Sequence, residues 1–220
     1  MKIAQILTVT ASLAGTAVIL SAQSITLDFE NNLVTGGDLV IQTAGTDAVD
    51  DFTGDRFDEQ SSALFQIQNI ATIGTLGVTA TALIDDLNVT GSGLQDGASG
   101  YNGAGEGTSF LFDTDVIITS LDWVSFTSLG SDSVTLSVGA TSIGTFGEGT
   151  VIGNTDFTST NPATMNIAVS AGDAFTITFD NGAFYLGQMG LTVVPEPNAY
   201  ALLSGICALA SIMLRRRSVN

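Results

Sequence analysis

The sequence predicts an all-β domain, an antiparallel two-sheet sandwich or jelly roll, between two terminal addressing segments. Apolar and polar residues alternate with a period of two through most of the chain, as in strands with one buried and one solvated face. Glycine occurs 25 times and proline three times, which suits many short strands joined by small-residue turns. No stretch of the middle region has sustained helical spacing, and about ten strands around one core favour a sandwich.

Seven segments carry the clearest alternation, each with apolar residues on one face and mostly polar residues on the other. The apolar positions are Ile25, Leu27, Phe29, Leu39, Ile41, Phe65, Ile67, Phe110, Phe112, Val134, Leu136, Val138, Met165, Ile167, Val169, Phe175, Ile177 and Phe179. We expect these residues to face the core. A closed barrel and a β-helix are the alternatives, although no repeat of about 20–50 residues supports a solenoid.

Two further segments predict how strands are placed in the sheets. Residues 115–127 form the longest apolar run. Because both of its faces are apolar, it predicts a central strand that contains a bulge. The sequence Asp180-Asn181-Gly182 is typical of a tight turn, and it predicts a hairpin between strands at 173–179 and 183–193.

The N-terminal segment, residues 1–22, has the pattern of a secretory signal peptide. Lys2 is followed by an apolar stretch from Ile3 to Leu20, and small residues precede Gln23. This order predicts cleavage after Ala22 by signal peptidase, following export by the Sec machinery. An uncleaved membrane anchor is the competing interpretation, and the small residues at the end of the run favour cleavage.

The C-terminal segment combines three features. Pro195-Glu196-Pro197 precedes 16 residues without charge, Ala199 to Leu214, and three arginines follow: Arg215, Arg216 and Arg217. As a helix, 16 residues span about 24 Å, slightly less than the hydrocarbon core of about 30 Å. The arginines are expected to remain cytoplasmic, so the domain would lie outside the inner membrane. A plain tail anchor is the alternative, but it does not require Pro-Glu-Pro.

This order of motif, apolar helix and arginine cluster resembles the PEP-CTERM sorting domain, over residues 194–217. The resemblance implies recognition by exosortase, a membrane cysteine protease that removes the tail. It also implies a Gram-negative host that makes exopolysaccharide. Three domains follow: signal peptide 1–22, β-sandwich 23–194 and sorting signal 195–217.

The charge of the middle region excludes one class of partner. Between residues 23 and 196 there are 22 acidic residues and a single arginine, a net charge of −21. Such a surface repels the phosphates of nucleic acids, so we expect no nucleic-acid partner. The chain has no histidine, and its one cysteine, Cys207, lies in the C-terminal apolar run. We therefore expect no disulfide, no histidine-dependent triad and no soft-metal site in the domain.

The densest acidic cluster lies in residues 47–59 and suggests a site for a hard cation. Asp47, Asp50, Asp51 and Asp55 are the preferred ligands, with Asp58 and Glu59 in reserve. Ca²⁺ takes six to eight oxygen ligands, which such a loop can offer. The spacing does not match an EF-hand, and a solvated polar loop in which Arg56 pairs locally is the alternative.

A second acidic group is predicted on the first strand. Asp28 and Glu30 share the wet face, and Asp180 joins them if the terminal strands pair. A solvated strand face without a ligand is the alternative.

Three residues are candidates for glycan contact. Tyr101 and Asn102 lie in the glycine-rich segment 91–107, which lacks the pattern of a phosphate-binding loop and is interpreted as a surface loop. Tyr185 is expected to be exposed and is the third candidate. Trp123 shares a face with Leu121 in a long apolar strand, which predicts core packing instead.

The middle region also resembles the β-sandwich domains common in PEP-CTERM proteins. The residues that carry this resemblance are Gly91-Ser92-Gly93-Leu94, then 105–113, Gly-Glu-Gly-Thr-Ser-Phe-Leu-Phe-Asp, then Ile118-Thr119-Ser120-Leu121-Asp122-Trp123. It implies a jelly roll similar to carbohydrate-binding modules and no settled activity.

Together these patterns predict an exported, exosortase-processed protein of the cell surface or extracellular matrix, without catalytic activity. Its expected role is structural or adhesive, with weak binding of extracellular polysaccharide, after a transient stay at the inner membrane. The alternative is a secreted carbohydrate-active enzyme, which would need a carboxylate pair at a set separation.

Overall fold

The computed structural model of the chain describes residues 22–42, 52, 60–71, 73–90, 93–96, 105–124, 132–147, 151–152, 155–156, 163–181 and 185–194. All of them belong to one compact unit, Ser21–Glu196. The expected signal helix and sorting helix lie outside these residues. Every regular element in the described ranges is a strand, and none of these ranges holds a helix long and apolar enough to cross a membrane.

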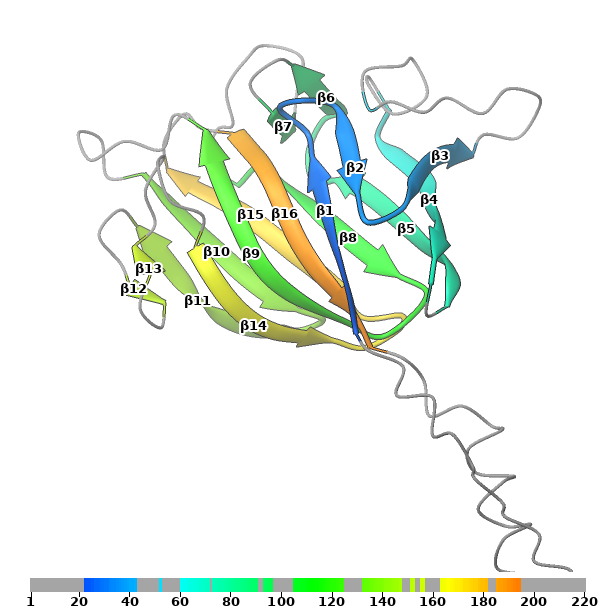
Figure 1. Cartoon of the computed structure of the whole chain (residues 1–220). Helices are drawn as coiled ribbons and strands as arrows, with labels where there is room; N and C mark the ends of the chain where they lie inside the picture. Colours follow the sequence, from blue (N-terminus) through cyan, green and yellow to red (C-terminus); the bar gives the residue numbers. More distant parts are fainter. Residues whose placement is uncertain are drawn as a thin grey trace, which may run out of the picture. The chain divides into compact units, whose positions relative to one another are not determined.

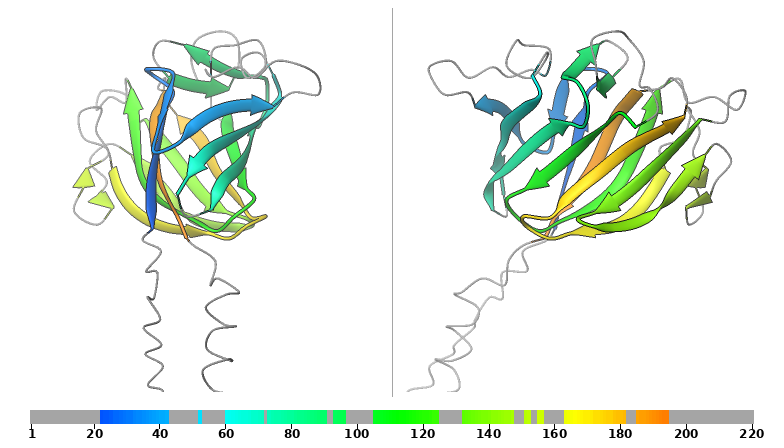
Figure 2. Two further views of the ribbon diagram at one scale, coloured as in Figure 1. Left: turned by 45° about the vertical axis from the view of Figure 1, so that its right-hand side comes forward. Right: turned by 180° about the vertical axis from the view of Figure 1, so that it is seen from behind.

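The strands form two antiparallel sheets in a sandwich-like arrangement (Figures 1 and 2). Sheet A has the order β14-β9-β16-β1-β2, and β7 also pairs with β16 while β6 pairs with β7. Its strands are β1 (Gln23–Asp28), β2 (Leu33–Thr35), β6 (Leu87–Thr90), β7 (Gly93–Asp96), β9 (Val116–Val124), β14 (Ala163–Val169) and β16 (Tyr185–Val193).

Sheet B has the order β11-β10-β15-β8-β5-β4-β3. Its strands are β3 (Asp38–Gln42), β4 (Ser62–Ile70), β5 (Gly74–Ala82), β8 (Gly107–Phe112), β10 (Ser133–Val138), β11 (Thr141–Gly147) and β15 (Ala174–Asn181). A separate short pair consists of β12 (Val151–Ile152) and β13 (Thr155–Asp156). The prediction of an all-β, two-sheet antiparallel fold is therefore confirmed.

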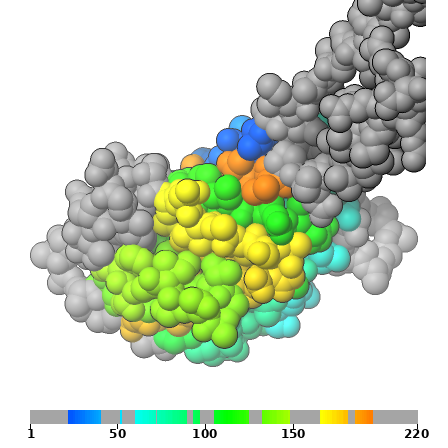
Figure 3. All heavy atoms as spheres, turned by 90° about the horizontal axis from the view of Figure 1, so that it is seen from below, coloured from blue at the N-terminus to red at the C-terminus, as the bar shows by residue number. Residues whose placement is uncertain are grey.

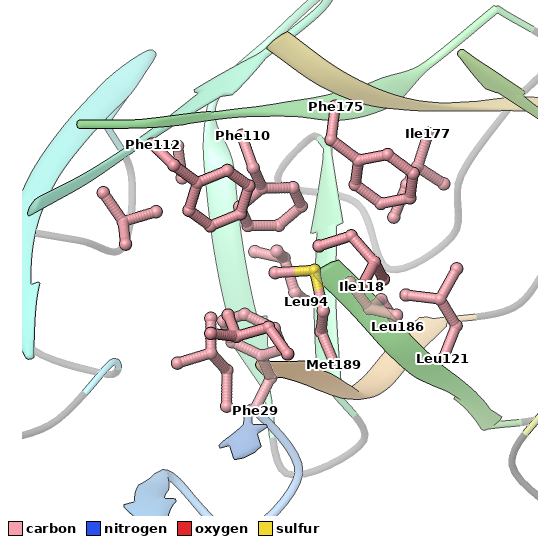
Figure 4. Close-up of a cluster of buried hydrophobic side chains, with 14 of the residues drawn as sticks. Phe29, Leu94, Phe110, Phe112, Ile118, Leu121, Phe175, Ile177, Leu186 and Met189 are labelled. Atoms are coloured by element: carbon pink, nitrogen blue, oxygen red, sulfur yellow. The ribbon is translucent and has the colours of Figure 1, made fainter. Parts of the chain in front are cut away.

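The core lies between the two sheets and contains the predicted inward-facing residues. Phe110, Phe112 and Phe175 come from sheet B and face Leu121 and Met189 of sheet A (Figure 4). Of the predicted set, Val138 and Ile167 are only partly buried, and the side chain of Ile41 lies outside the described ones. Period-two alternation located the core because each strand turns one face toward the opposite sheet.

The predicted hairpin at Asp180-Asn181-Gly182 is wrong. β15 and β16 lie in different sheets, since β15 pairs with β8 and β10 while β16 pairs with β1, β7 and β9. Both edges of β15 are thus occupied by strands from elsewhere in the chain. The connection after Asn181 therefore passes from sheet B to sheet A, as connections in sandwiches often do. A turn sequence predicts a local bend of the chain, but it does not predict whether the two strands that it connects pair with each other.

The prediction of a bulged central strand is confirmed by β9. This strand pairs with β14 on one edge and with β16 on the other. Along β16, Gly190 opposes Ser120 while the next residue opposes Ile118, so that Thr119 is the extra residue of a bulge in β9. Before the bulge Val116 and Ile118 are buried, and after it Leu121 and Trp123 are buried. The change of phase explains why this run looks apolar on both faces.

The first and last strands of the domain are neighbours. β1 pairs with β16 along its whole length, from Gln23 opposite Val193 to Asp28 opposite Gln188. Figure 3 shows the N-terminal strand in blue directly beside the C-terminal strand in orange. The chain therefore enters and leaves the sandwich at the same end of sheet A.

Candidate functional site

Neutral amide and hydroxyl groups bind several of the described carboxylates. No Lys or Arg occurs in the described ranges. Asp115, for example, accepts a hydrogen bond from the backbone N–H of Ala171 at 2.8 Å. Asp180 accepts one from the Thr135 hydroxyl at 2.6 Å. Hydrogen bonds to an ionised acceptor are stronger than bonds between neutral groups, which makes this arrangement possible.

Asp96 is the clearest case of a buried carboxylate held by backbone amides. It ends β7, and only 1% of its surface is exposed. Its Oδ2 accepts the N–H groups of Leu83, Ile84 and Gly107 at 3.0, 3.0 and 2.9 Å. Its Oδ1 accepts the N–H of Asp85 at 2.8 Å. Because Gly107 begins β8, this carboxylate links sheet A to the loop 83–86 and to sheet B.

A second acidic group surrounds the turn after β1. Asp28 is buried, with 7% of its surface exposed. Its Oδ1 accepts the backbone N–H of Asn31 at 2.8 Å, and its Oδ2 accepts Nδ2 of Asn31 and Nε2 of Gln188, each at 3.0 Å. A short aspartate side chain that binds a nearby backbone N–H stabilises a local bend of the chain. Asp28 therefore fixes the turn that carries the exposed Glu30.

A bulge in β16 lies where this strand pairs with the segment of β9 that carries Asp122, the third acidic residue near this turn. Leu186 opposes Trp123 and Gln188 opposes Asp122, which leaves Gly187 as the extra residue. The carbonyl oxygen of Gly187 accepts the N–H groups of Phe29 and Glu30 at 2.9 and 3.3 Å. A Cβ at position 187 would lie 2.8 Å from Cγ2 of Val124, so a glycine permits this close approach.

Gln188 lies between Asp28 on β1 and Asp122 on β9 in the strand register. The resulting acidic turn site consists of Asp28, Glu30 and Asp122. Burial raises the pKa of Asp122 above its ordinary value of 3.8, while a hydrogen bond from the backbone of Trp123 lowers it. The negative charges of Glu30 and Asp28 raise this pKa further. Asp122 therefore holds a proton more readily than an ordinary aspartate.

In the acidic turn site, the carboxyl group of Asp122 binds a proton more readily than usual because it is partly buried and because Glu30 and Asp28 are also acidic. No group of three or more acidic, histidine or cysteine side chains in the described ranges has the arrangement of a metal site. Asp28 already uses both oxygens to fix the turn. We therefore treat the site as a place where charge repulsion is concentrated.

The predicted association of Asp180 with Asp28 and Glu30 is wrong. Asp180 lies on β15 in sheet B, where Thr135 of the neighbouring strand binds it. The terminal strand that joins β1 is β16. The sequence analysis missed Asp122 as a member of this group. The position of Asp122 between the buried residues Leu121 and Trp123 indicates that its side chain points out of the core. Only the order of the strands shows which other acidic residues lie near it.

The predicted cation ligands Asp47, Asp50, Asp51 and Asp55 lie outside the described residues, as do the reserves Asp58 and Glu59. One residue of that segment, Phe52, is described. It is fully buried, with its ring centroid 4.8 Å from that of Phe29 and 5.5 Å from that of Phe65. Its backbone N–H donates a hydrogen bond to Oδ1 of Asn32. Phe52 thus contacts the same turn that carries Glu30.

The predicted glycan residues have different outcomes. Tyr185 begins β16 and is only 9% exposed, so its expected exposure is wrong: the residue lies in an interior strand of sheet A, opposite Val124. Tyr101 and Asn102 lie outside the described residues. Trp123 is 1% exposed and its ring packs edge-on against Phe179 at 6.2 Å, which confirms the prediction of core packing.

The predicted sorting residues Pro195, Glu196, Pro197, Arg215, Arg216 and Arg217 also lie outside the described residues. The last described residue before them is Val194, whose N–H donates to the carbonyl oxygen of Asp115 at 3.0 Å. Comparison with known proteins adds no identification: no family model, no curated protein and no solved structure matches this chain.

Proposed function

We propose that this chain is an exported, non-catalytic β-sandwich protein of the cell surface or extracellular matrix of a Gram-negative bacterium. In this proposal signal peptidase removes residues 1–22, and exosortase recognises the sorting signal 195–217 and removes the tail after about Pro197. The domain then has a structural or adhesive role among extracellular polysaccharides. The proposal includes a jelly-roll strand arrangement, a signal helix before the domain and a sorting helix after it.

One observation carries the proposal. Within the described residues the strands begin at Gln23 and end at Val193, next to the two predicted processing segments. Gln23 and Val193 are register partners, so both cuts would fall at one end of the sandwich and neither would remove a strand. A domain bounded in this way is suited to release from a temporary membrane tether with its fold intact.

The charge distribution supports an extracellular role. The outward side chains of both sheets include many Ser, Thr, Gln and Asp residues beside a few exposed apolar ones such as Leu64 and Leu111, and no described residue is cationic. A strongly negative surface keeps an exported protein dispersed and weakens contact with anionic lipid. Such a surface does not repel neutral polysaccharide, and weak binding of such a polymer is the adhesive role that we propose.

The test is the processing of the full chain in a host with exosortase and in the same host without it. Mass spectrometry of material outside the cells should show Gln23 as the first residue and no peptide from 199–217. A Pro195→Ala plus Pro197→Ala variant should remain with the membrane, whereas Ser218→Ala, outside the motif, should be processed normally. An intact segment from Ala199 to Arg217 outside the cell would refute exosortase processing.

The acidic turn site favours the alternative of a carbohydrate-active enzyme in one respect. Glycosidases pair a carboxyl of raised pKa with a second carboxylate, and Asp122 has a raised pKa beside Glu30. Host polysaccharide incubated with the mature protein distinguishes the two functions. Release of reducing ends that Asp122→Asn abolishes would support the enzyme, and binding on a glycan array without hydrolysis would support adhesion.

A further inference from the structure

The side chain of Gln23 connects three separate parts of the sandwich. Its Nε2 donates a hydrogen bond to the carbonyl oxygen of Gly36 at 2.6 Å, and its Oε1 accepts one from the backbone N–H of Ala71 at 2.7 Å. Gly36 lies where the chain passes from β2 of sheet A to β3 of sheet B, and Ala71 follows β4. Both polar atoms of the amide are therefore engaged.

The position of Gly36 depends on its conformation. Its φ of 89° lies in the left-handed region, which favours glycine over other residues. A side chain at this position would also collide with the backbone of Ser24. The turn is thereby held close to the start of β1, and its carbonyl oxygen is within reach of Gln23.

Cleavage after Ala22 would make Gln23 the N-terminal residue, and an N-terminal glutamine has a characteristic reaction. Its α-amine nitrogen attacks its own Cδ, a carbon–nitrogen bond closes a five-membered lactam, and Nε2 leaves as ammonia. The product is pyroglutamate. The reaction needs no oxidant and no co-reactant, and it removes the positive charge of the amine.

We propose that the folded domain protects Gln23 from this cyclisation and so preserves a free α-amine at the mature N-terminus. The inference rests on the proposed signal cleavage. Ring closure requires Cδ to approach the α-amine of the same residue, but hydrogen bonds to residues 13 and 48 positions along the chain hold the amide away. Loss of Nε2 as ammonia would also deprive the Gly36 carbonyl of its donor.

The protected amine matters because positive charge is scarce in this protein. Arg56 is the only basic residue between positions 23 and 196. An α-amine with a pKa of about 7.7–8.0 is largely protonated at neutral pH. The mature N-terminus would therefore add a second positive charge beside Val193, its register partner, and would offer a primary amine for attachment at the end of the domain where the tail is removed.

The experiment treats the mature protein, isolated from the culture medium, with glutaminyl cyclase and follows the intact mass and the N-terminal peptide. The hexapeptide Gln-Ser-Ile-Thr-Leu-Asp, with the same first residues, is the unprotected reference. We expect the protein to lose ammonia at least tenfold more slowly than the peptide. Equal rates, or a freshly isolated protein already lighter by one ammonia, would overturn the inference and leave the proposed function standing.

Two variants separate the hydrogen bond from general shielding. Ala71→Pro removes the N–H that binds Oε1 and should raise the cyclisation rate toward that of the peptide, whereas Ala71→Ser keeps this N–H and should not. A folded Ala71→Pro protein that cyclises as slowly as wild type would overturn the role of this bond. An N-terminus at a residue other than Gln23 would overturn the proposed cleavage itself, and the intact mass distinguishes that result from the loss of ammonia.

Discussion

Asp96, at the end of β7, accepts the backbone N–H of Gly107 at the start of β8, and this bond joins the two sheets through a buried carboxylate. The same side chain accepts three further N–H groups from the loop 83–86. A negative charge in the interior is normally balanced by a cation. At Asp96, four oriented backbone N–H groups contribute to this balance.

We predict that Asp96→Ala strongly destabilises the domain. Four backbone donors lose their acceptor, of which the Gly107 bond is buried and the other three are part-buried. A buried donor left unsatisfied costs about 1–3 kcal/mol and a donor that water can reach costs less, so the loss should be on the order of 3–5 kcal/mol. Asp96→Asn should cost less, because one oxygen remains. Urea unfolding of the mature protein measures both, with Asp86→Ala, an exposed neighbour in the loop, as the control. A loss below about 1 kcal/mol, the range of an ordinary hydrogen bond, would contradict the structural role.

We predict that Asp122→Asn stabilises the domain at neutral pH. The folded pKa of Asp122 is raised above 3.8, so the folded state holds the proton more tightly than the unfolded chain does. Stability from this group is therefore complete below the unfolded pKa and is lost as pH rises through the folded pKa. The site is partly solvated, so the gain from Asn should be only a few tenths of a kcal/mol.

The check is the difference in unfolding free energy between Asp122→Asn and wild type across pH. It should grow as pH rises above 3.8 and then level off. Asp173→Asn, at an exposed carboxylate, serves as the control. A difference that shrinks with rising pH would contradict the assigned direction of the pKa shift.

We predict that added salt raises the thermal midpoint of the mature protein. Its net charge is strongly negative, and no ion pair occurs among the described residues that salt could weaken. Salt therefore screens mainly repulsion. Melting curves between low and physiological NaCl measure the effect, and a midpoint that falls with NaCl would show that attractive ion pairs dominate.

Calcium should act beyond this screening if the predicted cation loop binds it. Melting curves in millimolar Ca²⁺, in Mg²⁺ and in NaCl of matched ionic strength separate the two effects. A specific site predicts a rise in Ca²⁺ alone, because a ligand that binds only the folded state stabilises it. Asp50→Ala plus Asp51→Ala should remove that rise. Equal shifts in all three salts would leave the segment as a solvated acidic loop.

We predict that residues 23–194 form the complete folding unit. The last strand ends at Val193, and the N–H of Val194 bonds to Asp115. Circular dichroism of the mature protein should show β-sheet with a helix content well below the roughly one-third typical of globular proteins. A chain that ends at Gln188 lacks the partners of Gln23 to Leu27, which are five of the six residues of β1, and it should fail to fold cooperatively.

The sequence by itself determined the fold class and the core. Alternation at Phe175, Ile177 and Phe179 placed these side chains inside because a strand turns successive residues to opposite faces, and that property is local. The bulge in β9 was also readable, since the apolar phase changes between Ile118 and Leu121. The scarcity of cations in the middle region, where Arg56 is the single basic residue, was likewise evident from composition.

Only the tertiary structure decided which strands are neighbours and therefore which acids meet. Asp122 joins Asp28 and Glu30 because β16 lies between β9 and β1, whereas Asp180 lies in the other sheet. The exposure of Tyr185 and the engagement of Gln23 likewise depended on partners distant in the sequence. Strand order results from the packing of the whole chain into two sheets, and a turn such as Asp180-Asn181-Gly182 is equally compatible with a hairpin and with a crossing between sheets.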